Sequence, residues 1–177
     1  GYSKGAYSAL ALAGGKLKLS QYEKYCTLKP NMPDCIFYND NIFKEKINFE
    51  KSYLDKRFSF IVSIDPIFSL SFDNESLKKI KIPILLISSE YYSLEDTDMD
   101  LYGKSIYKYL DSKKSRYKLI KNSGHFDFLP LCKKEAVEIL KAEGEGEEII
   151  CMSGERDRKE IHDETVENIL KFLYDIN

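Results

Sequence analysis

The 177-residue sequence lacks the features that mark several common classes of protein. No apolar run approaches the roughly 18 to 20 residues that a membrane-spanning helix requires. The 27 Lys and Arg residues nearly balance the 29 Asp and Glu residues, so the net charge of −2 provides no electrostatic basis for binding nucleic acid or an anionic membrane. The sequence also has no internal repeat and no low-complexity tract. With 43% hydrophobic and 13% aromatic residues, the composition is that of a globular domain.

Cysteine is scarce, and its spacing is informative. The four cysteines form no C-x-x-C pair, which leaves a zinc or redox site poorly supported. Cys26 and Cys35 bracket a loop stiffened by two prolines, which a disulfide could close. We predict that Cys26 pairs with Cys35 and that Cys132 pairs with Cys151, against the alternative of four buried free thiols in the cytosol. The even count favours an oxidising compartment, and we expect a periplasmic or secreted protein.

Residues 1–5 read G-Y-S-K-G, which is the G-x-S-x-G pattern of a nucleophile elbow. In such an elbow a serine lies on a tight turn between a strand and a helix, and we expect both glycines to relieve backbone crowding there. Small, helix-forming residues follow up to Ala13, and Gly14 and Gly15 then end the predicted helix. The alternative is an ordinary Gly/Ser turn before a buried helix. Because a strand must feed an elbow, we expect this chain to be the C-terminal portion of a longer enzyme.

The remaining pattern predicts an α/β fold with a mostly parallel sheet flanked by helices. Residues 58–64 and 82–88 read as strands buried on both faces, and residues 116–120 read as a third strand. Helical segments are predicted at 75–79, 101–110 and 133–142, and a last helix is predicted from about residue 159. The apolar face of this last helix would carry Val166, Ile169, Leu170, Leu173 and Ile176. Residues 149–151 look strand-like. We expect a single, incomplete domain over residues 1–177, with an irregular excursion at about 16–55 that contains the first cysteine pair.

Three polar residues follow predicted strands: Ser3 follows the expected upstream strand, Asp65 the first visible strand and His125 the third. Chemistry in parallel sheets gathers at the carboxyl ends of strands. Ser3 is a weak nucleophile that would need His125 as its base, and His125 would need a carboxylate to fix its tautomer. Each residue alone has an ordinary explanation, since an Asp before Pro is often a turn and a loop His is usually solvated. The serine, acid, histidine order is that of α/β-hydrolases.

On several stretches the chain resembles the C-terminal half of a known family. The stretches are residues 1–15, 61–66 (IVSIDP), 82–91 (IPILLISSEY), 123–128 (SGHFDF) and the closing Cys151, Asp157-Arg158 and His162. The family is that of predicted dienelactone hydrolases and platelet-activating-factor acetylhydrolase-like lipases, which have the α/β-hydrolase fold. The resemblance implies a serine ester hydrolase with Ser3, Asp65 and His125 as its triad and no cofactor. Dienelactone hydrolases often use a cysteine nucleophile, so the serine favours the lipase-like branch.

The acid of this triad has a competing assignment. Many α/β-hydrolases place it after the next strand, where this sequence has Tyr92, which cannot serve as an acid. Glu95 and Asp96 follow in a dense acidic loop, and they are the fallback for this role. The acetylhydrolase-like relatives instead place the acid directly after the earlier strand. We therefore assign the acid to Asp65.

Other polar residues receive weaker roles. The backbone N–H of Lys4 is the expected oxyanion donor, with a second donor from an earlier loop. His162 lies beside acidic residues near the start of the last helix, so it is expected at the helix surface or as a partner of the acidic loop. No ligand spacing repeats, and no metal is expected. The predicted substrate is a small-molecule or lipid ester. A non-catalytic, truncated remnant is the alternative, and a binding module is disfavoured because all three triad positions are present.

Overall fold

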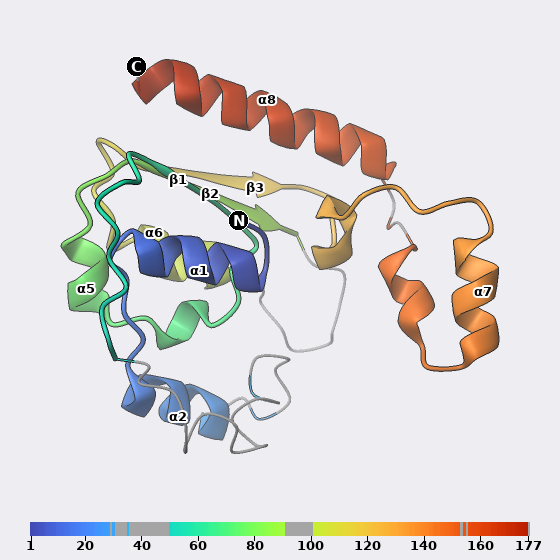
Figure 1. The fold of residues 1–177 in the computed structure, drawn as a ribbon, viewed down its shortest axis with the longest axis horizontal. Helices are drawn as coiled ribbons and strands as arrows, with labels where there is room; N and C mark the ends of the chain where they lie inside the picture. The colour runs from blue at the N-terminus through green and yellow to red at the C-terminus, as the bar shows by residue number, and fades with distance from the viewer. Residues whose placement is uncertain are drawn as a thin grey trace.

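A parallel three-stranded sheet forms the centre of the computed structural model, which describes residues 1–28, 30, 35, 50–90, 101–152, 154 and 156–176 (Figure 1). The strand order is β1 (Ile61–Ile64), β2 (Ile84–Ser89) and β3 (Arg116–Ile120). Ile61 pairs with Ile84, and Leu85 pairs with Arg116. The prediction of an α/β fold with a parallel sheet flanked by helices is confirmed. The third strand has the predicted bounds, whereas β1 starts three residues later than predicted, because Phe58 and Phe60 lie in an exposed loop.

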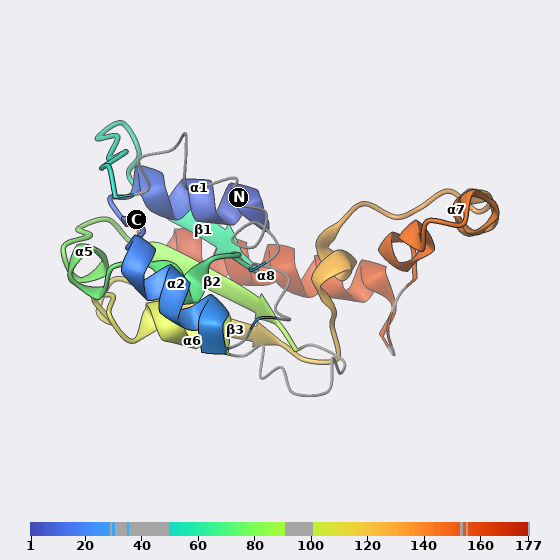
Figure 2. The same cartoon turned by 90° about the horizontal axis from the view of Figure 1, so that it is seen from below.

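Helices cover both faces of the sheet, as Figures 1 and 2 show. α1 (Lys4–Leu12) and α6 (Leu101–Tyr107) lie on one face, and α8 (Arg158–Ile176) lies on the other. Successive residues of β2 point to opposite faces, so Ile84 and Leu86 join the first core cluster while Leu85 and Ile87 join the second. All six residues of β2 are buried. A continuous apolar run is the pattern expected of a strand covered on both sides.

The buried face of α8 differs from the predicted one. Val166 and Leu170 are 53% and 60% exposed, whereas Ile161 and Phe172 are almost completely buried. Ile169, Leu173 and Ile176 pack partly against the same cluster, as predicted. The sequence pattern allowed two adjacent faces, and the helix turns the large Phe172 ring inward, where its centroid lies 6.4 Å from that of Phe60. Packing against the sheet therefore decided the rotation of this helix.

In its described part, the segment predicted as an irregular excursion forms the helix α2 (Leu19–Leu28), which buries Tyr22, Tyr25 and Cys26. Cys26 forms a disulfide with Cys35, as predicted. Residues 29, 31–34 and 36–49 of the excursion lie outside the described residues. After β1 come a short 3-10 turn, η2 (Ser69–Ser71), and α5 (Asn74–Lys78), whose N-cap Asp73 accepts a hydrogen bond from the Ser76 amide.

After β3 the chain forms η3 (His125–Phe128) and then an arm that extends from the body of the molecule (Figure 2). The arm carries α7 (Ala136–Glu143) and η4 (Glu147–Ile150), and the predicted disulfide between Cys132 and Cys151 closes its base. The strand-like reading of residues 149–151 is wrong, because the left-handed Gly146 (φ 77°) starts a 3-10 turn there. Among the described helices, none has the length and apolarity needed to cross a bilayer.

Candidate active site

The backbone of Ser3 has a conformation that non-glycine residues seldom adopt, with φ 53° and ψ −119°. Tyr2 forms a parallel bridge with Ile64, and the Ser3 amide donates to the Ile64 carbonyl at 3.0 Å. α1 then begins at Lys4, so Ser3 is its N-cap, yet the serine side chain makes no capping hydrogen bond. Such a conformation typically costs about 1–3 kcal/mol, and it directs the hydroxyl away from the helix amides.

The two glycines around Ser3 differ in their need to be glycine. A Cβ atom on Gly1 would lie 2.1 Å from the carbonyl oxygen of Gly5, a contact that backbone atoms cannot relieve without moving. A Cβ on Gly5 would meet nothing within 4 Å. The expectation that both glycines relieve crowding is therefore correct for Gly1 and wrong for Gly5. The turn is tight only on the side where the chain enters it.

The structure brings Ser3, His125 and Asp65 together in one hydrogen-bonded chain. Nε2 of His125 lies 3.0 Å from Oγ of Ser3, and Nδ1 lies 2.6 Å from Oδ2 of Asp65. A carboxylate can only accept, so the proton of the neutral imidazole resides on Nδ1. Nε2 is then left as the acceptor for the Ser3 hydroxyl. This is the arrangement in which an imidazole can take a proton from a serine.

Asp65 follows β1 directly, and its backbone also has a positive φ, of 49°. Its carboxylate is 9% exposed and is held by Ser89 at the end of β2. The Ser89 amide donates to Oδ1 at 2.9 Å, and the Ser89 hydroxyl donates to Oδ2 at 2.7 Å. Sequence reasoning missed Ser89. The signal was its position at the end of the neighbouring parallel strand, which places its side chain beside the residue that ends β1.

The turn that carries His125 is held from several sides. Asp127 accepts from the Gly124 amide at 2.7 Å, which closes the short 3-10 turn around the histidine. Arg158 lies 3.6 Å from the Asp127 carboxylate, and both side chains are 3% exposed. On the opposite side, the Tyr2 hydroxyl donates to the His125 carbonyl at 2.6 Å. Neither Tyr2 nor Arg158 was given a separate role from the sequence.

The other residues singled out from the sequence lie as follows. Lys4 is the first residue of α1, so its backbone amide lies at the amino end of that helix, beside Ser3. His162 is half-buried and its Nε2 lies 2.9 Å from the Asp127 carbonyl oxygen, so it contacts the His125 turn, while the acidic loop that was its other expected partner falls outside the described residues. Tyr92, Glu95 and Asp96 fall outside the described residues. Within the described ranges, no three metal-ligating side chains form a group.

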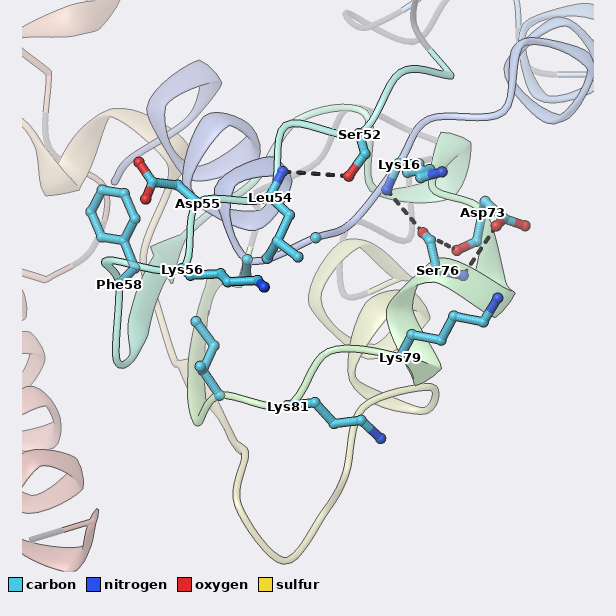
Figure 3. Close-up of a pocket in the computed structure, with 13 residues that line it drawn as sticks. Lys16, Ser52, Leu54, Asp55, Lys56, Phe58, Asp73, Ser76, Lys79 and Lys81 are labelled. Carbon is cyan, nitrogen blue, oxygen red and sulfur yellow. Dashed lines mark hydrogen bonds between the residues drawn. The ribbon is translucent and has the colours of Figure 1, made fainter.

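A cavity of about 520 Å³ lies at the amino ends of β1 and β2, at the other end of the sheet from Ser3, Asp65 and His125 (Figure 3). Its lining comes from residues that precede β1 and β2, such as Phe58 and Ile82, and from the end of α1 at Ala13. Ser3, Asp65 and His125 all lie beyond the carboxyl ends of the strands, and none of them lines this cavity. The hydrogen-bonded chain and the cavity are thus separate features of the molecule.

The comparisons with known proteins add no relative. No protein-family model, no curated protein and no solved structure matches this chain. The functional interpretation consequently depends on the geometry of the residues described above.

Proposed function

We propose that this chain is the C-terminal portion of an α/β-hydrolase domain that hydrolyses carboxylic esters, in the manner of acetylhydrolase-like lipases. The supporting observation is the chain of hydrogen bonds from Ser3 Oγ through His125 to Asp65. It is reinforced by the positive φ of both Ser3 and Asp65, because strained residues of this kind gather at active sites. The α/β fold alone hosts many activities, so the site carries this proposal.

The proposed reaction uses the protein's own side chains and no cofactor. Ser3 Oγ attacks the ester carbonyl carbon while His125 Nε2 takes the hydroxyl proton. The bond from that carbon to the alkoxy oxygen then breaks, and the departing alcohol receives the proton from His125. Water, deprotonated by the same Nε2, attacks the acyl carbon. The bond from that carbon to Ser3 Oγ then breaks, Nε2 returns the proton to Oγ, and the carboxylic acid leaves. Asp65 accepts from Nδ1 throughout and stabilises the imidazolium.

The oxyanion would form beside the amino end of α1, where the backbone N–H of Lys4 is the proposed donor. The helix dipole favours negative charge at this position. The second donor belongs to an upstream loop in this proposal. One lost donor typically costs about 10²–10³ in kcat, so we expect this chain alone to hydrolyse esters little or not at all.

The outer edge of β1 supports an upstream half of the same domain. Residues 1–3 already pair with the carboxyl end of β1, through bonds from the Gly1 amine to Val62 and from the Ser3 amide to Ile64. In a parallel ladder the N–H and C=O of one residue face the same neighbouring strand. The Val62 N–H therefore also points to this outer edge of β1, next to Phe60, which is 38% exposed. Among the described residues, none beyond residues 1–3 pairs with this outer edge, and an uncovered, partly apolar edge is one that proteins normally cover. A preceding strand parallel to β1 would cover it.

The surroundings of the site support an apolar ester, from a small molecule or a lipid, as the substrate. The aromatic ring of Phe126 lies 5.5 Å from that of His125, and Phe128 also packs in this region. The two disulfides support a periplasmic or secreted location, since such bonds persist in oxidising compartments. The alternative remains a non-catalytic remnant that keeps the three residues without the strands and donor that catalysis needs.

A fluorophosphonate probe tests the proposal, because it phosphonylates an activated serine with loss of fluoride. In the natural gene product we expect labelling at Ser3 that Ser3→Ala abolishes. Asp65→Asn should slow labelling by about 10³–10⁴, because the amide favours the tautomer whose Nε2 already carries a proton. Ser8→Ala is the matched control, since Ser8 is an exposed serine one turn further along α1 whose hydroxyl donates to the carbonyl oxygen of Lys4.

Two outcomes would decide against the proposal. Undiminished labelling in the Ser3→Ala variant would show that another residue is the nucleophile. A natural gene product that is folded but not labelled at all would favour the non-catalytic alternative.

A further inference from the structure

Tyr2 connects the nucleophile elbow directly to the turn that carries His125. Its backbone is held against β1 through the bridge to Ile64, and it is bonded covalently to Ser3. Its hydroxyl donates to the carbonyl oxygen of His125 at 2.6 Å, across 123 residues of sequence. One side chain thus spans the gap between the element that supplies the serine and the element that supplies the histidine.

The Tyr2 ring also packs against the imidazole. The ring centroids of Tyr2 and His125 lie 4.9 Å apart with an interplanar angle of 31°, within the range of favourable aromatic pairs. Phe128 packs on Tyr2 at 6.1 Å, and Phe126 meets the imidazole edge-on at 5.5 Å. The hydrogen bond limits where the His125 backbone can lie, and the stacked rings limit how its side chain can rotate.

This double contact matters because the distance between His125 Nε2 and Ser3 Oγ depends on two separate elements. Ser3 belongs to the start of α1, while His125 lies in a four-residue 3-10 turn after β3. A misplacement of about 1 Å between two such elements can cost 10²-fold in rate. A residue next to Ser3 that also holds His125 makes the two elements move together.

We propose that Tyr2 is a positioning residue, which sets the geometry between His125 and Ser3 through its hydroxyl and its ring. This inference rests on the proposed function, but its structural part can be tested apart from activity. The variants are Tyr2→Phe, which removes only the hydroxyl, and Tyr2→Leu, which also removes the ring. Tyr174 is a matched control position, because it is 86% exposed near the end of α8.

The first measurement is the second-order rate constant for fluorophosphonate labelling of Ser3 in the natural gene product. We expect Tyr2→Phe to lower it by up to about tenfold, the equivalent of one ordinary hydrogen bond. Tyr2→Leu should lower it by about 10²-fold. For a nitrophenyl ester the loss should fall on kcat and leave KM nearly unchanged. Tyr174→Phe and Tyr174→Leu should leave the labelling rate unchanged.

The second measurement is the NMR resonance of the proton shared by His125 Nδ1 and Asp65, which does not require turnover. It should broaden or disappear in Tyr2→Leu, weaken less in Tyr2→Phe, and persist in both Tyr174 variants. If the wild-type protein shows the resonance but no labelling, the proposed function fails while Tyr2 is still tested. A folded Tyr2→Leu protein that keeps both the resonance and the wild-type labelling rate would overturn the assignment. If Tyr2→Leu does not fold, a Tyr2→Phe protein with the wild-type resonance and the wild-type labelling rate would overturn the assignment of Tyr2.

Discussion

Replacing Arg158 by methionine should strongly destabilise the protein, because this side chain holds several separate segments. Arg158 is buried at the start of α8, where its Nε lies 3.6 Å from the Asp127 carboxylate. Its Nη atoms donate to the carbonyl oxygens of Pro130 at 3.2 Å, Ile150 at 2.9 Å and Met152 at 3.4 Å. These contacts tie both ends of the arm to the His125 turn.

The expected cost follows from what the substitution leaves behind. In Arg158→Met the Asp127 carboxylate stays buried, and among the described residues the Gly124 amide is the hydrogen-bond donor that it keeps, at 2.7 Å. Breaking a buried pair in this way typically costs about 3–5 kcal/mol, a large share of the roughly 5–15 kcal/mol that stabilises a native protein. For a protein of this size that loss corresponds to a fall in Tm of about 6 to 20 °C. The His125 turn should loosen with it.

Urea and thermal unfolding measure this loss directly. Lys159→Met is the matched control, because Lys159 is the next residue of α8 and its ion pair with Asp163 is exposed, so the free energy of unfolding should stay nearly unchanged. The double variant Arg158→Met with Asp127→Asn should recover part of the loss, since no uncompensated charge then remains buried. A single variant that loses less than about 1 kcal/mol would refute the argument that this pair anchors the arm.

Three further substitutions test the crowding at the elbow and the ion pairs of Glu164. Gly1→Ala should cost about 1–3 kcal/mol by forcing the elbow open, whereas Gly5→Ala should stay within about 0.5 kcal/mol, as measured by thermal unfolding; equal effects would contradict the crowding argument. Burial raises the pKa of Glu164, but hydrogen bonds from Lys118 and Arg156 outweigh it and leave that pKa lowered. Glu164 therefore stabilises the fold above its unfolded pKa of about 4.3, and this contribution disappears as pH falls through the lower folded value. In urea titrations Glu164→Gln should cost up to about 1 kcal/mol at pH 7 and progressively less as the pH falls below the unfolded pKa, and a pH-independent cost would contradict this linkage.

Local patterns in the sequence were sufficient to predict those strands whose formation depends on residues that are close in sequence. The continuous apolar run of β2 and the bounds of β3 follow from residues adjacent in sequence, which decide whether a segment can be buried on both faces. The positions of Ser3, Asp65 and His125 after strands also follow from local order. Because parallel strands end at one edge of a sheet, that order predicted that the three side chains meet, once the family resemblance had favoured Asp65 over Glu95 and Asp96 as the acid.

Contacts between distant segments were decided only by the tertiary structure. Ser89 holds Asp65 because the register of β1 and β2 places them side by side, and Tyr2 reaches His125 because β1 aligns the elbow with the turn after β3. The buried face of α8 and the freedom around Gly5 likewise depend on how the helices pack. The spacing of apolar residues identifies a broad stripe on a helix, but it does not show which part of that stripe is buried. A motif specifies residue types, but it does not specify the side chains that surround them. The side chains that hold the site in place are therefore set by packing between elements, which no local pattern encodes.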